Sequence, residues 1–238
     1  MRIGAIWYNG KSSEDVGLRV EHHPHRIIPA RKREIVNVPG RNGNLIFDQD
    51  SYENYVQAYD VWVDPSRGYY ETAQAAAAWL NSAKGYKRLE DENDADTYRL
   101  AYFSGNADFD NRLSLLGKAT LHFNCKPQRW LKSGEETVSI TASGAVVSNP
   151  TAFAALPYIK VYGSGAGELF VGQITCTLHD IDEYIELDSD LQNAYKATEN
   201  KNSTVSIPQF PALQPGDNAI TWSGGITSVE IVPRWWTL

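Results

Sequence analysis

Alternation of apolar and polar residues recurs along the chain and predicts a protein built mostly from β-strands. The run from Leu116 to Cys125 shows it most clearly, because Ala119, Leu121 and Phe123 alternate with polar neighbours. Glycine and proline interrupt such runs at short intervals, as they do in sandwich and barrel proteins. We expect Lys126-Pro127 to end this strand, since proline cannot donate a ladder hydrogen bond.

Two pairs of runs predict β-hairpins. In the first, Glu34–Val38 and Asn44–Phe47 flank the turn Pro39–Gly43, whose Asn-Gly pair tolerates positive φ. In the second, Tyr86–Leu89 and Tyr98–Phe103 flank an acidic tip. The first hairpin, together with the residues that lead into it, spans Arg31 to Phe47.

One segment has helical periodicity. Thr72–Lys84 holds six alanines, and Gly85 suits the position just after a helix. We expect the buried face to carry Ala73, Ala76, Ala77 and Leu80, with Trp79 at its margin.

Composition changes near Lys132 and predicts a domain boundary, so we expect domains at residues 1–131 and 132–238. Residues 131–152 are rich in Ser, Thr, Gly, Ala and Glu, and no convincing helix follows. Short strand-like runs then recur at sandwich spacing. Gly163–Gly167 is expected to be a flexible hairpin. The predicted strands are Thr137–Thr141, Tyr158–Tyr162, Glu168–Val171, Gln173–Leu178, Tyr184–Leu187, Thr204–Ile207, Ala219–Trp222 and Val229–Val232.

Charge and hydropathy exclude several classes of protein. The chain has 238 residues and a formal net charge of −7, which argues against a duplex-binding protein. Its apolar stretches are too short for a membrane span, and its first residues are too short for a signal peptide, so we expect synthesis in the cytosol. Cys125 and Cys176 form neither a disulfide framework nor a zinc set, and buried free thiols are expected.

Three polar clusters have residue types that occur in metal or catalytic sites. His22, His23 and His25 suit zinc or nickel, but no cysteine or carboxylate lies at ligand spacing, so we favour a surface loop. The acidic run Glu90–Asp96 lacks the residue order of a calcium loop, and a solvated hairpin tip is preferred. The carboxylates of Asp180–Asp190 are more typical of a solvated sheet face than of a glycosidase. We therefore expect no metal, no cofactor and no catalytic residue.

Three late tryptophans leave two interpretations. Trp222, Trp235 and Trp236 either stack on sugar rings or pack into a core. Because Trp235 and Trp236 are adjacent, a strand would point them to opposite faces, whereas a sugar platform needs aromatic rings on one face. We therefore expect a structural or protein-docking sandwich with no working sugar site. A lectin-like carbohydrate-binding module stays the alternative.

An ordered set of short motifs resembles the distal tail protein (Dit) family of siphophages. Each motif is weak alone, but together they span the chain in the family's order. The motifs are Gly17–Val20, Val38–Gly43, Ala78–Leu80, Phe123–Pro127, Asn149–Thr151, Leu187–Ser189, Ala194–Lys196, Gly216–Asn218 and Pro233–Trp236.

The resemblance implies a non-enzymatic hub at the virion tail tip. It implies an N-terminal β-sandwich with one helix and a projecting hairpin, which forms a hexameric ring, single or stacked. It also implies a C-terminal galectin-like β-sandwich outside that ring. The implied partners are further copies of the chain, the major tail tube protein, the tail-associated hub or lysin protein, and in many relatives a receptor-binding protein. The protein would be made in the host cytoplasm, from a phage or a prophage, and DNA would pass the lumen without specific binding.

The first hairpin would then correspond to the one that reaches toward a neighbouring subunit. A projecting hairpin leaves backbone groups at its edges unpaired, and a neighbour can pair them. Its apolar and tip residues are the candidate subunit interface: Ile35, Val38, Arg41, Asn42, Leu45 and Ile46.

Overall fold

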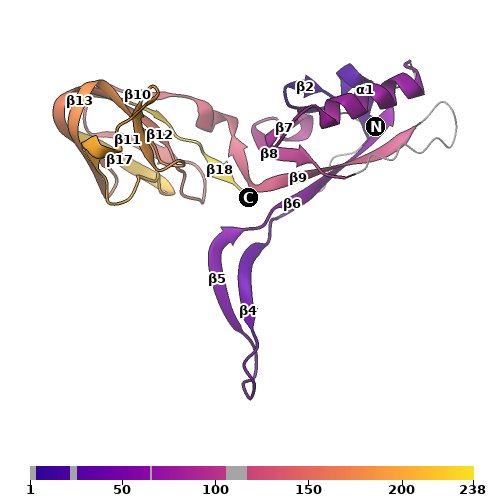
Figure 1. Cartoon of the computed structure of the whole chain (residues 1–238), viewed down its shortest axis with the longest axis horizontal. Coiled ribbons are helices and arrows are strands. Elements are labelled where there is room, and N and C mark those ends of the chain that lie inside the picture. The colour runs from indigo at the N-terminus through magenta and orange to yellow at the C-terminus, as the bar shows by residue number, and fades with distance from the viewer. Residues whose placement is uncertain (1–3, 22–25, 65, 106–116) are drawn as a thin grey trace. The chain divides into compact units, whose positions relative to one another are not determined.

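The computed structural model describes residues 4–21, 26–64, 66–105 and 117–238 of a mostly β protein (Figure 1). The chain divides into two compact units, the first ending at Arg129 and the second running from Trp130 to Thr237. Each unit has its own cluster of buried apolar side chains. The expectation of a mostly β, two-domain fold with one helix is confirmed.

A single curled sheet forms the body of the first unit. Its strand order is β2-β1-β7-β8-β9-β6-β3, and a bridge between Gly4 and Val20 brings the segment before β1 against β3. Alternate residues of the strands point into the core, as the burial of Tyr59, Val61 and Val63 along β6 illustrates. The strands are β1 Ile6–Tyr8, β2 Lys11–Ser12, β3 Leu18–Val20, β6 Tyr55–Val63, β7 Lys87–Asp91, β8 Thr97–Phe103 and β9 Lys118–Leu131. Short 3₁₀ turns join strands that follow one another in the chain: Glu14–Val16 (η1) lies between β2 and β3, and Glu92–Asp94 (η2) between β7 and β8.

The helix α1 (Tyr69–Asn81) begins and ends three residues earlier than predicted. Ser82 ends it through bonds from its amide and hydroxyl to the Trp79 carbonyl, at 3.3 and 2.7 Å, so Gly85 lies beyond the helix and not at its C′ position.

The buried face of α1 also differs from the prediction. Trp79 is buried with Ala76 and Leu80, and its indole N–H donates to the Tyr8 carbonyl at 3.0 Å, whereas Ala77 is exposed. The buried ring thus has both apolar contact and an acceptor for its one polar atom.

Pro127 does not end its strand, contrary to expectation, because β9 continues to Leu131. Cys125 is the last β9 residue paired with β6, where it lies opposite Tyr55. Pro127 lies beyond that pairing, so its missing N–H removes no hydrogen bond to β6.

Three long strands make the second unit. β12 (Tyr158–Val171), β13 (Ile174–Asp188) and β17 (Gly216–Val232) pair side by side, with β12 in the centre. The shorter β10 and β11 pair with opposite ends of β17, and β14 and β16 pair with different parts of β13. The long strands β13 and β17 therefore contribute to both layers of a β-sandwich. The shorter elements are η3 Lys132–Glu135, β10 Val138–Ile140, β11 Ala145–Asn149, β14 Asn193–Lys196, β15 Glu199–Asn200, η4 Asn202–Thr204, β16 Val205–Ser206 and β18 Trp236–Thr237.

Each long strand replaces two predicted short ones, and Gly163–Gly167 is the middle of β12 rather than a flexible hairpin. Here β12 passes very close to β17: a Cβ at Gly225 would lie 1.8 Å from the Ser164 carbonyl oxygen. Glycine therefore marks a close approach of two backbones in mid-strand, which local sequence does not distinguish from a turn.

Candidate functional site

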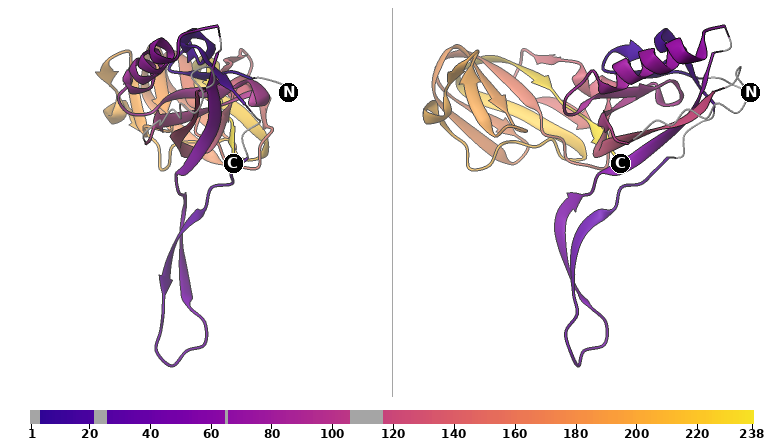
Figure 2. Two further views of the ribbon diagram at one scale, coloured as in Figure 1. Left: turned by 90° about the vertical axis from the view of Figure 1, so that its right-hand side faces the viewer. Right: turned by 45° about the vertical axis from the view of Figure 1, so that its right-hand side comes forward.

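The predicted interface residues lie on a two-stranded sheet made by β4 (Arg31–Val36) and β5 (Leu45–Tyr52). Both views of Figure 2 show these strands as a ribbon of their own, in indigo and purple. The strands lie nearer the base of the hairpin than predicted, because β4 ends before Val38 and β5 continues past Phe47.

Both faces of this hairpin carry apolar side chains. Ile35 lies opposite Ile46, which places them on one face, and Val36 opposite Leu45 on the other. Phe47 shares the face of Leu45, since strand residues two apart point the same way. The exposed fractions are 61% for Ile35, 60% for Ile46 and 55% for Phe47. An isolated two-stranded hairpin is marginally stable in water, so association that covers these faces is favourable.

Ion pairs link the strands near the hairpin base. The Arg31 guanidinium lies 3.0 Å from Asp48 and 3.2 Å from Asp50, and that of Arg33 lies 3.7 Å from Asp48. Exposed pairs of this kind contribute roughly 0.2–1 kcal/mol each. A register shift between Arg31 and Arg33 also falls here. The base is therefore polar, and the apolar residues lie toward the tip.

The tip is a tight turn. The Arg41 amide donates to the Val38 carbonyl at 3.2 Å, and Gly40 has φ of 80°, as the third residue of a type II turn requires. Gly43 also has positive φ, at 78°. Arg41 and Asn42 are exposed here, while Val38 is half-buried.

The six predicted residues thus lie on one hairpin but not on one surface. Ile35 and Ile46 share a face, Leu45 lies on the other, and the remaining three are at the tip. Sequence reasoning missed Val36 and Phe47, although the alternation Leu45, Phe47 is visible in the sequence.

The acidic tip of the second hairpin is solvated in part and structural in part. Asp91 is buried, and Asp94 Oδ2 accepts hydrogen bonds from two buried guanidiniums, Arg99 at 3.2 Å and Arg129 at 3.3 Å. The Glu92 carboxylate accepts from the Ala5 amide at 3.0 Å. Glu92, Asn93, Ala95 and Asp96 are exposed, as expected of a solvated tip, while Asp91 and Asp94 are also engaged within the fold. His22, His23 and His25 lie outside the described residues.

Several carboxylates of the segment Asp180–Asp190 are likewise engaged within the fold. Arg234 donates to both oxygens of Asp188, at 2.8 and 2.9 Å. Burial alone would raise the pKa of Asp188, but hydrogen bonds from Arg234 and from the Leu191 and Asp190 amides outweigh it, and the pKa is lowered. The hydrogen bond from Lys196 lowers the pKa of Asp182. These groups are therefore held ionised, which suits structural ion pairs.

Both cysteines are free and buried, one in each unit, as predicted. Burial raises the pKa of Cys125 to about 11 and that of Cys176 to about 12. Thiols that stay protonated in this way are poor nucleophiles.

All three late tryptophans pack against the core of the second unit. Trp235 is buried, Trp222 is partly buried, and Trp236 stacks on Phe153 with ring centroids 4.5 Å apart. The Trp236 indole donates to the Ala154 carbonyl at 2.9 Å. These rings therefore form no open platform together.

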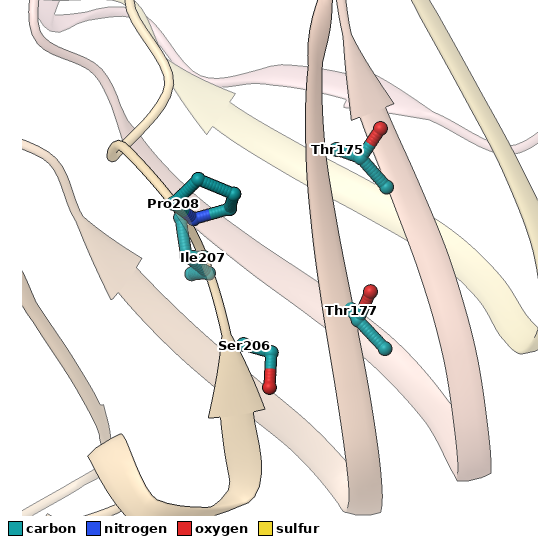
Figure 3. A pocket seen from close by; sticks show the side chains of 5 residues that line it. All are labelled: Thr175, Thr177, Ser206, Ile207 and Pro208. Carbon is teal, nitrogen blue, oxygen red and sulfur yellow. The ribbon is translucent and has the colours of Figure 1, made fainter.

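The hollows on the surface of the second unit include two whose linings contain polar side chains. One, of about 440 Å³, is lined by Thr175 and Thr177 of β13 and by the neighbouring segment Ser206–Pro208 (Figure 3). It carries no charged group, and Ser206 Oγ lies 2.8 Å from His179 Nε2. The other hollow is lined by tyrosine, serine and glutamate and is described below.

Within the described residues, no cluster of three or more His, Cys, Asp or Glu side chains is arranged to hold a metal ion. In the same part of the chain, no helix has the length and hydropathy of a membrane span.

The described residues form two curled β units, with one helix and a long hairpin in the first, and this is a fold of the phage distal tail protein type. The chain is similar over its whole length to the solved Dit protein of phage SPP1, described as a paradigm of the hub adsorption apparatus in phages that infect Gram-positive bacteria. The TM-score is 0.76 and the identity 13%, with all of both chains covered. A chain of the activated phage P2 baseplate is also similar, with TM-score 0.48 and 8% identity over 97% of this chain and 98% of that one. No family model and no curated protein matches the sequence.

Proposed function

We propose that this protein is a structural hub of a siphophage tail tip. Six copies form a ring that joins the tail tube to the tail-associated hub protein and to the host-adhesion device. Two observations support the proposal: the shared fold with SPP1 Dit across the whole chain, and the hairpin with exposed apolar side chains on both faces.

The hairpin carries the argument for assembly. Both apolar faces of the hairpin need to be covered. When the hairpin inserts against a neighbouring copy, that copy can supply a surface for each face. Such a contact is heterologous, because the hairpin of one copy meets a different surface of the next. Heterologous contacts close into a ring when the rotation between copies permits it.

Charge is consistent with a ring around a DNA passage. The formal net charge of −7 disfavours adhesion of the nucleic acid to the protein. We assign no catalytic role, since Asp182, Glu186 and Asp188 are held in ion pairs and hydrogen bonds within the fold.

The experiment is native mass spectrometry of the full chain combined with negative-stain electron microscopy. The proposal predicts hexamers, or multiples of six if rings stack, and particles with a central hole. Monomers or dimers at all concentrations would contradict it and favour the lectin-like alternative.

A further inference from the structure

The second unit has a polar hollow of about 580 Å³ on the face of its sheet opposite the core. It lies where β12 runs between β13 and β17, and Tyr162, flanked by Tyr184 and Ser228, belongs to its lining. The other lining side chains are Ser164, Glu183, Thr227, Ser228 and Glu230.

Three departures from regular strand geometry meet at this hollow. Tyr162 pairs with Ser228 but Gly163 pairs with Ile226, so Thr227 is an extra residue in β17. A Cβ at Gly163 would lie 2.3 Å from the Gly225 carbonyl oxygen. Glu183 has φ of 63°, which is unusual for a residue with a side chain. Bulges and strained residues gather at sites where side chains are aimed at a ligand.

The hydrogen-bonding groups of the hollow include both donors and acceptors. Tyr162 donates its phenolic proton to Glu230 Oε2 at 2.9 Å, which leaves Glu230 Oε1 to accept from a ligand. The hydroxyls of Ser164 and Ser228 can donate or accept. Glu183 lies 3.5 Å from Lys196 Nζ, so an ion pair already offsets part of its charge.

This inventory favours a polyhydroxylated ligand over a cation. A cation would use only the acceptors of the hollow, and Lys196 already pairs with one of its two carboxylates. Sugar hydroxyls both donate and accept, so they can use the serine hydroxyls, the Glu230 carboxylate and the Lys160 ammonium, which lies 5.1 Å from the Tyr162 ring centroid. We propose that this hollow is a saccharide-binding site. The expectation that the second unit has no sugar site concerned the tryptophans, whereas this proposal concerns the separate hollow at Tyr162.

The site does not depend on the ring, and its test is separate. The full-length protein is applied to a microarray of bacterial surface polysaccharides. It is then titrated with methyl glycosides of glucose, galactose, N-acetylglucosamine and rhamnose while backbone amide NMR signals are recorded. We expect saturable binding of at least one of these, with the largest shifts at residues 162–164 and 227–230.

Two substitutions localise the binding. Glu230→Gln and Ser164→Ala should each weaken it about tenfold, as expected for lost hydrogen bonds to a charged and a neutral group. Glu168→Gln is the matched control, because Glu168 is an exposed glutamate of β12 outside the hollow. Ser164 is exposed, so its substitution should leave the fold intact even if that of Glu230 does not.

Three results would overturn the proposal. They are no saturable binding to any of these glycans, binding that the control weakens as much as the hollow variants do, and shifts confined to residues outside the hollow.

Discussion

The double substitution Ile35→Asp with Leu45→Asp should split the ring while leaving both units folded. The two residues lie on opposite faces of the hairpin, so the variant alters both surfaces that a neighbour would cover. Ile35 is 61% exposed and Leu45 half-buried, so neither is part of the core of its unit.

The size of the effect follows from the area that association would still bury. Full burial of such a side chain stabilises by roughly 1.5–3 kcal/mol. Because about 60% of Ile35 is open, it has about 1–2 kcal/mol left to gain. Leu45 is half-buried and has at most about 1 kcal/mol left. The loss is therefore about 1–3 kcal/mol per contact, or roughly 5–150-fold in affinity, before the cost of burying two carboxylates is added.

The assay is native mass spectrometry across a dilution series, with circular dichroism and thermal melting as checks of the fold. The matched control replaces Val146 and Leu191 by Asp, since these exposed apolar residues of the second unit lie off the hairpin. We expect monomers for the hairpin variant and hexamers for the control. Hexamers of the hairpin variant at wild-type concentrations would refute the argument.

Three further predictions concern the two units. A chain ending at Arg129 should still form rings, measured by negative stain; a folded but strictly monomeric fragment would show that the ring contacts lie elsewhere. Arg234→Met should cost the second unit about 2–4 kcal/mol in chemical denaturation, because it strands the buried Asp188 carboxylate. Since the pKa of Asp188 is lowered, the pair's stabilisation is complete above the unfolded value of about 3.9 and is lost as pH falls through the lower native pKa, so wild type and variant should converge only in acid. Gly225→Ala should destabilise by about 2 kcal/mol or more, because its Cβ would overlap the Ser164 carbonyl; an unchanged melting temperature would contradict that contact.

Local patterns in the sequence determined the kinds of elements and much of their order. Alternation along Ala119–Cys125 is a property of the strand itself, and so is the turn chemistry of Pro39–Gly43. The candidate interface was found in this way, because an apolar strand-turn-strand is a local signal and its motif resembles a known family. These features follow from periods of two residues and from allowed φ values, which need no knowledge of the rest of the chain.

Tertiary structure decided what lies far apart in sequence but close in space. Gly163 lies in the middle of a strand, where the β17 backbone approaches it closely. Pro127 is tolerated in β9 because the pairing of β9 with β6 ends at Cys125. The polar hollow joins side chains from β12, β13 and β17, so no sequence window contains it. The buried Trp79 indole finds its acceptor 71 residues away in the sequence. Such outcomes depend on which backbones and polar groups meet, and these contacts are fixed only when the strands pair.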